Sequence, residues 1–200
     1  MINTLIETAP EPEAEEELNA AQLDPGQIDA AHLDPAVEIL CQGQWPQSAD
    51  DTVPQIAGFI ISSFNPLVAE AAERCLRRRP GRPPAARTAI LLASHSGDRA
   101  TARAVAEAVS AGRRVPPLLF FQSNPNAVLG HIAARWGLTG PVVAVGRSAG
   151  AVGPTPEVLA EATLLLRDGD ADEVLVIVAE QGASPEEGDS AIAVLVALRH

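Results

Sequence analysis

The chain has 200 residues, of which 46% are hydrophobic, and this is enough for one domain with a well-buried core. Its net charge of −12 disfavours a nucleic-acid partner. No apolar run reaches about 18 residues and no charged-then-apolar leader opens the chain, so we expect a cytoplasmic protein without a membrane span or signal peptide.

The negative charge is concentrated near the N-terminus. Residues 1–35 contain nine of the 26 Asp and Glu residues and no Arg. A segment of this composition cannot bury enough apolar surface to fold alone. We therefore expect a disordered acidic arm over residues 1–35, which ends in a near-repeat (Leu23-Asp24-Pro25, then Leu33-Asp34-Pro35), and one domain over residues 36–200.

Apolar runs and turn residues predict the elements of the first half of the domain. A strand is expected at Val37–Cys41, and Ile56–Ile61 is either a strand or a buried approach to the next helix. Asn65 is expected to cap that helix, with Pro66 at its first position and Arg77-Arg78-Arg79 at its end. The next predicted elements are a strand at Thr88–Ala93, a helix from its cap Asp98 to Ala111, and an apolar piece at Pro116–Phe121.

The second half alternates helices and strands in the same way. We expect a helix at Asn126–Trp136, a buried strand at Val142–Val145, a helix at Pro156–Arg167 and strands at Glu173–Ala179 and Ala191–Leu198. Strands separated by helices of about 10–15 residues indicate an α/β fold with a mixed, mostly parallel five-stranded sheet covered by helices on both faces. The short link before Ala191–Leu198 predicts that this strand is antiparallel and lies at an edge.

A strand that runs into an elbow of small residues lies at Gly140–Gly150, and several α/β folds hold out a nucleophile on such an elbow. Gly146-Arg147-Ser148-Ala149-Gly150 fits the Gly-x-Ser-x-Gly pattern of hydrolases, which also requires a later histidine and a helix directly after the serine. The only later histidine is the terminal His200, and Gly153-Pro154 interrupts the expected helix. An elbow without a nucleophile is the favoured interpretation, and a small acyltransferase or hydrolase that uses Ser148 is the alternative.

Other polar residues have structural explanations beside functional ones. Ser94–Asp98 ends a strand, where ligand-binding residues often lie, but a polar turn with Asp98 as a helix cap accounts for it as well. We expect His131 to be a packed histidine, and Cys41 and Cys75 to be buried, unpaired thiols. No Gly-rich phosphate loop and no metal-ligand spacing is present, so neither a cofactor nor a metal is expected.

Five segments follow one another in a fixed order: Asn65-Pro66-Leu67, Pro117…Phe121…Asn124-Pro125-Asn126, Gly137-Leu138-Thr139-Gly140-Pro141, Ala162–Asp172 and Glu187–Val196. This ordered set resembles the N-terminal half of β-ketoacyl synthases, over about residues 37–200. The resemblance implies one half of a thiolase-type fold, with three layers.

The chain departs from the family where the chemistry would occur. Counting forward from Gly140 by the family's spacing places Ala149 at the nucleophilic cysteine, and counting back from Asp168-Gly169 places Val152 there. The family's two catalytic histidines lie in its C-terminal half, which this chain lacks. Decarboxylating condensation requires a thiolate to hold the acyl group and imidazoles to stabilise the enolate. The resemblance therefore implies a fold without condensing chemistry.

The resemblance also implies partners. We expect a catalytically inactive, ketosynthase-like accessory or structural subunit in bacterial polyketide or fatty-acid-type biosynthesis. Synthases dimerise across the strand before the elbow, here Val142, Val143, Ala144 and Val145, which predicts a homodimer or a heteromer with a ketosynthase or chain-length-factor subunit.

An arginine cluster is a second candidate surface. Synthases receive acidic acyl carrier proteins on Arg-rich surfaces, and the residues concerned are Arg77, Arg78, Arg79 and Arg82, together with Arg113 and Arg114. Favourable placement at a helix C-terminus and in a solvated turn explains the same residues without a partner.

Overall fold

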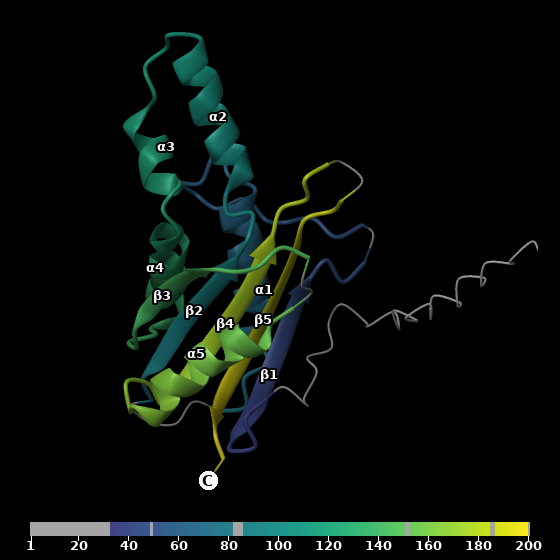
Figure 1. Cartoon of the computed structure of the whole chain (residues 1–200), viewed down its shortest axis with the longest axis vertical. Helices are drawn as coiled ribbons and strands as arrows, with labels where there is room; N and C mark the ends of the chain where they lie inside the picture. Colours follow the sequence, from purple (N-terminus) through teal and green to yellow (C-terminus); the bar gives the residue numbers. More distant parts are fainter. Residues whose placement is uncertain (1–32, 49, 82–85, 151–152, 185–186, 200) are drawn as a thin grey trace, which may run out of the picture.

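The computed structural model describes residues 33–48, 50–81, 86–150, 153–184 and 187–199 (Figure 1). These residues form five strands and five helices. The strands are β1 (Val37–Trp45), β2 (Thr88–Ser94), β3 (Val142–Gly146), β4 (Glu173–Glu180) and β5 (Ser190–Leu198). The helices are α1 (Phe64–Leu76), α2 (Arg99–Ser110), α3 (Pro117–Gln122), α4 (Pro125–Trp136) and α5 (Pro156–Arg167).

The five strands form one mixed sheet in the order β1-β5-β4-β2-β3. β2 pairs in parallel with β4 and β3, whereas β5 is antiparallel to both β4 and β1. The α/β class is confirmed, but the expected predominance of parallel pairing is wrong. The antiparallel direction of β5 is confirmed and its position at an edge is wrong, because β1 pairs with the side of β5 that faces away from β4.

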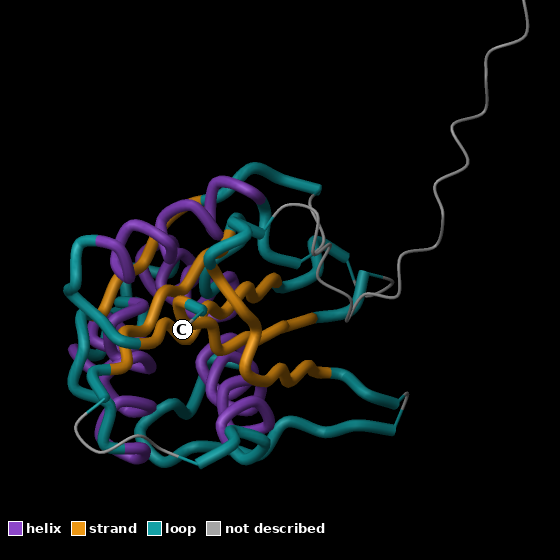
Figure 2. Tube along the Cα trace, turned by 90° about the horizontal axis from the view of Figure 1, so that it is seen from below, coloured by secondary structure: helices purple, strands orange, loops and turns teal. Residues whose placement is uncertain are grey.

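Helices cover both faces of the sheet, as predicted (Figure 2). α1 and α4 pack on one face, where Leu67 and Leu129 belong to the same buried cluster as Leu175. α5 packs on the other face, where Leu166 joins the cluster that contains Val176. Because both faces are covered, β4 and β5 are nearly continuous apolar runs.

Two helix starts test the predicted caps. Asp98 caps α2, accepting a hydrogen bond from the Thr101 N–H at 2.9 Å, as predicted. The predicted cap Asn65 is wrong, since α1 begins at Phe64 with Ser63 as its N-cap residue. The Asn65 amide is buried instead and donates to Ser62 Oγ at 2.8 Å and to the Gln122 carbonyl at 3.1 Å. Asn65 is therefore a buried residue that satisfies its amide through hydrogen bonds within the domain, and it does not cap the helix.

Two apolar segments differ from their predicted form. Residues 56–61 form neither a strand nor a buried segment, since Gly58 turns the chain at a φ of 93° and the Ile60 side chain is 73% exposed. The apolar piece at Pro116–Phe121 forms the short helix α3, which stands with α2 beyond the end of the sheet (Figure 1). On α3, Phe120 is 81% exposed.

β3 is an edge strand and not the buried strand that its sequence predicts. Val142 is 39% exposed, and Ala144 is also exposed. Only Val143 and Val145 pack against the α5-side cluster. Although the sequence of β3 is apolar, the described part of the chain thus leaves the side chains of Val142 and Ala144 exposed.

The predicted acidic arm falls almost wholly outside the described residues. At its end, Leu33 packs against the α5-side cluster, and the Asp34 carboxylate accepts a hydrogen bond from Arg167 at 2.5 Å. These two residues therefore belong with the domain. Across the described ranges, no helix is both long and apolar enough to span a bilayer.

Candidate functional site

Three neighbouring parallel strands end at the same edge of the sheet. β2 ends at Ser94 and leads into His95–Gly97, β3 leads into Arg147–Gly150, and β4 ends at Glu180. In open α/β sheets, ligands bind outside the carboxyl ends of such strands. We take the surface formed by these three strand ends as the candidate site.

Glu180 holds the loop that follows β2. Its two carboxylate oxygens accept hydrogen bonds from the main-chain N–H groups of His95 and Ser96, each at 2.8 Å. The neighbouring Gln181 side chain accepts from the Arg99 N–H, in the first turn of α2, at 2.7 Å. These bonds satisfy main-chain donors that no sheet or helix pairs. The loop is therefore a hydrogen-bonded turn. The sequence analysis missed the role of Glu180, and the signal that could have revealed it is a carboxylate at the end of an apolar strand.

The elbow after β3 is joined to the same turn. The Arg147 N–H donates to the Ser94 carbonyl at 3.3 Å, and the Arg147 carbonyl lies 3.2 Å from His95 Nδ1. The Arg147 side chain is only 2% exposed, and its Nη1 lies 3.7 Å from Glu180 Oε1. The buried side chain of Arg147 thus extends from the elbow towards the end of β4. The sequence analysis assigned no role to this residue.

The elbow carries no nucleophile paired with a base among the described residues. Ser148 and Ala149 are exposed, and Gly150 has a φ of 80°. α5 begins at Pro156, six residues after Gly150, so Ser148 does not lie at a helix N-terminus. The described hydrogen bonds join the His95 ring to Arg147 and not to Ser148. Val152 and His200 lie outside the described residues.

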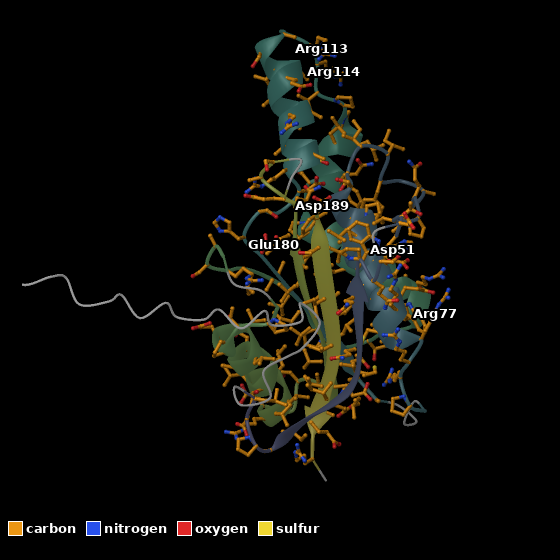
Figure 3. The ribbon with its side chains drawn as sticks, turned by 90° about the vertical axis from the view of Figure 1, so that its right-hand side faces the viewer. Asp51, Arg77, Arg113, Arg114, Glu180 and Asp189 are labelled. Atoms are coloured by element: carbon orange, nitrogen blue, oxygen red, sulfur yellow. The ribbon has the colours of Figure 1, made fainter. Side chains whose placement is uncertain are left out.

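A cavity of about 340 Å³ lies beside the elbow. Trp45, Val178 and Ile192 supply apolar walls, and Arg147 and Glu180 supply the charged groups. Such a cavity has the character of a small-molecule site, which is mostly apolar with a few polar groups. Figure 3 shows Glu180 near the upper end of the sheet.

The two cysteines lie together. Cys75 is fully buried and Cys41 is half-buried, and their sulfur atoms are 3.6 Å apart as free thiols. His131 is a packed histidine, with its ring edge-on to Phe59 at 6.2 Å between centroids. In the described part of the chain, no three His, Cys, Asp or Glu side chains gather as metal ligands.

The described arginines of the predicted cluster differ in exposure and in partners. Arg77 is exposed and pairs with Glu73, while Arg78 donates to the Gln42 carbonyl at 3.0 Å. The Arg79 side chain is only 8% exposed and pairs with the buried Glu173. Arg82 lies outside the described residues, and Figure 3 shows Arg113 and Arg114 at the tip beyond α2, far from Arg77.

Solved structures that share this fold include the following three. The first is a chain from the complex of the ketosynthase ApeO with its chain length factor ApeC from Xenorhabdus doucetiae, with a TM-score of 0.65 and 15% identity over 83% of this chain and 80% of that chain. The ishigamide ketosynthase/chain length factor gives a TM-score of 0.56 and 19% identity over 76% and 48% of the two chains. A β-ketoacyl synthase from Burkholderia phymatum STM815 gives 0.58 and 18% identity over 76% and 46%.

These structural matches show the fold, and the chain spans about half the length of two of the three. No curated protein sequence matches the chain. A family model, described as "Beta-ketoacyl synthase, N-terminal domain", matches residues 42–187, which is most of the chain. The chain therefore belongs to the β-ketoacyl synthase family and corresponds to the N-terminal domain of that family.

Proposed function

We propose that this chain is a non-catalytic, ketosynthase-type subunit that pairs through β3 with a ketosynthase in polyketide or fatty-acid-type biosynthesis. The exposed apolar edge of β3 is the observation that carries the proposal. Two structural matches, a ketosynthase in complex with its chain length factor and a ketosynthase/chain length factor, support this choice of partner.

The two edges of the sheet differ in how they are covered. At β1, α1 covers the strand: Arg78 donates to the Gln42 carbonyl at 3.0 Å and Arg74 to the Gln44 carbonyl at 3.1 Å. At the opposite edge, β3 pairs with β2 alone among the described strands. An exposed apolar edge strand is a template for pairing with another chain. β3 is therefore the edge that favours a partner.

The register shows which main-chain groups of β3 face outward. The Pro141 carbonyl accepts from the Ile90 N–H at 2.8 Å, and the Arg147 N–H donates to the Ser94 carbonyl at 3.3 Å. Because alternate residues of a strand face the same neighbour, Val143 and Val145 also pair with β2. The N–H and C=O groups of Val142, Ala144 and Gly146 therefore face away from the sheet.

This alternation provides a selective variant. Ala144→Pro removes an outward N–H while leaving the bonds to β2 in place, and proline is tolerated at the outer side of an edge strand. Ala144→Thr, which keeps the N–H and suits a strand, is the matched control. We expect sedimentation velocity at micromolar concentration to show a heterodimer of the wild-type chain with a ketosynthase from the same organism. Ala144→Pro should weaken this association at least about tenfold, which corresponds to a loss of about 1.4 kcal/mol.

The outcomes distinguish the parts of the proposal. A chain that stays monomeric with and without the ketosynthase overturns it. A homodimer that excludes the ketosynthase overturns the choice of partner. Equal association by Ala144→Pro and Ala144→Thr overturns the assignment of the interface to β3.

The absence of a nucleophile at the elbow predicts chemical inertness. Ser148 lies in an exposed loop without a hydrogen bond to His95, so nothing described there lowers the barrier to its attack. We expect a fluorophosphonate probe to leave the protein unlabelled. Labelling that disappears in Ser148→Ala would instead establish the hydrolase or acyltransferase alternative.

A further inference from the structure

The two cysteines of the chain meet where β1 packs on α1. Cys41 Sγ and Cys75 Sγ are 3.6 Å apart, and the Cys75 thiol also lies 3.4 Å from the Cys41 carbonyl oxygen. The sequence contains no other cysteine. Neither thiol lines the cavity beside the elbow, so the pair is separate from the candidate site.

The backbone holds these two sulfur atoms close together. A Cβ added to Gly43 would lie 2.3 Å from the Cys75 nitrogen. β1 therefore lies so close to the main chain of α1 that only glycine fits at this position. On either side of Cys75, Arg74 and Arg78 donate to the carbonyls of Gln44 and Gln42. The two segments are thus fixed to each other on both sides of the thiols, and the sulfurs need only come closer to form a bond of about 2.0 Å.

The two thiols differ in access and in acidity. Cys41 is half-buried, whereas Cys75 is fully buried. The hydrogen bond with Cys75, aided by the charges of Arg79 and Arg78, lowers the pKa of Cys41 below its usual range although burial opposes the shift. The same hydrogen bond and burial raise the pKa of Cys75. Reaction with an oxidant follows thiolate character and exposure, so Cys41 is the thiol that reacts first.

We propose that Cys41 and Cys75 form an oxidisable dithiol that a hydroperoxide converts into a disulfide between β1 and α1. The Cys41 thiolate attacks one oxygen of hydrogen peroxide, the O–O bond breaks, and sulfenic acid and hydroxide form. The Cys75 sulfur then attacks the Cys41 sulfur and displaces a second hydroxide, while the Cys75 proton and one solvent proton complete two water molecules. Two thiols lose two electrons in all, and one peroxide gains them.

The crosslink would act on the cavity beside the elbow. Gln44 and Trp45, at the end of β1, line that cavity, and Cys41 lies in the same strand. A disulfide at Cys41 holds β1 against α1 and so fixes one wall of the cavity. The chain between the two cysteines is a loop of more than 30 residues, and closing such a loop restricts the unfolded state. We expect the thermal midpoint of the oxidised protein to rise by roughly 10 °C.

Intact-mass measurement on the full chain tests the proposal. The protein is treated with one to two equivalents of hydrogen peroxide, denatured, and alkylated with N-ethylmaleimide. We expect a loss of about 2 Da, no maleimide adduct, a monomer on a non-reducing gel, and return of both adducts after treatment with dithiothreitol. Two adducts after peroxide, or sulfinic acid at Cys41 without a disulfide, would overturn the proposal.

Two single variants separate the roles of the thiols. In Cys75→Ser, which keeps a hydroxyl beside Cys41, the Cys41 sulfenic acid has no resolving thiol, so dimedone should trap it. In Cys41→Ser, the buried Cys75 should react with peroxide at least about tenfold more slowly than Cys41 does in Cys75→Ser. Equal rates in the two variants would contradict the assigned order. Circular dichroism of both variants checks that they are folded.

Discussion

Gly43 shows how a single residue sets the distance between two elements. A Cβ added there would lie 2.3 Å from the Cys75 nitrogen and 2.9 Å from the Ala71 carbonyl oxygen, both of which are main-chain atoms. We expect Gly43→Ala to lower the free energy of unfolding by about 1–3 kcal/mol, because backbone atoms must move to admit the methyl group.

Gly130 in α4 supplies the control for this variant. A Cβ added to Gly130 meets nothing within 4 Å. Gly130→Ala should stabilise the protein by up to about 1 kcal/mol, the usual difference between the two residues inside a helix. Denaturation in urea measures both variants, and a Gly43→Ala variant as stable as Gly130→Ala would show that β1 does not lie this close to α1.

Residue-level prediction succeeded where the determinants were local. Asp98 caps α2 through the N–H of a residue three positions later, and this short-range geometry is encoded in adjacent residues. Asn65 has the same sequence signature but bonds to Gln122, 57 residues away. Such a partner depends on how α1 and α3 pack, and no local pattern contains it.

At the scale of elements, Glu73 joins α1 to α4. Its carboxylate accepts hydrogen bonds from Arg135 at 2.8 Å and from the Trp136 ring N–H at 3.1 Å, and it pairs with Arg77 at 2.9 Å. The hydrogen bond from Arg135, with those from Arg77 and Trp136, lowers the pKa of Glu73 to about 2, although burial opposes the shift. The carboxylate is therefore held in its charged form by the contact between the helices.

Glu73→Gln should reveal this contact through the pH dependence of stability. A carboxylate whose pKa is lower in the folded state contributes stability above its unfolded pKa, and this contribution is lost as the pH falls through the folded pKa. We expect Glu73→Gln to be less stable than wild type by on the order of 1–2 kcal/mol at pH 7, since Arg77 and Arg135 are themselves exposed. The difference should shrink between about pH 4.5 and pH 2.

The control is Glu161→Gln, on the exposed side of α5. Unfolding in urea at several pH values compares the two variants with wild type. A difference between wild type and Glu73→Gln that stays constant from pH 7 to pH 2 would contradict the assigned role of Glu73.

The positions of the strands along the chain were predictable from sequence, but which strands lie next to each other in the sheet was less predictable. Apolar runs identified all five strands, but a short link shows only that β5 turns back beside β4. It carries no information about the other side of β5, where β1 arrives from the start of the domain. For the same reason the apolar sequence of β3 suggested burial, whereas its position at the edge leaves Val142 exposed.

For the whole molecule, the candidate site was predictable in part. The elbow and the absence of a cysteine at Ala149 are visible in the sequence. The cavity beside it is not, because Trp45, Glu180 and Ile192 come from three strands brought together only by the sheet order. The burial of Arg79 against Glu173 was not predictable either, because consecutive arginines at a helix end point in different directions.

The proposed function requires that a strand of another chain completes the sheet at β3. Residue-resolved amide hydrogen exchange tests it directly, because successive N–H groups of β3 face opposite sides. In the protein alone, the N–H groups of Val143 and Val145 should be protected and that of Ala144 should exchange freely. With the ketosynthase present, we predict that exchange at Ala144 slows at least about tenfold. Exchange at Ala144 that is equally fast with and without the partner, in samples where the two proteins associate, would contradict pairing through β3.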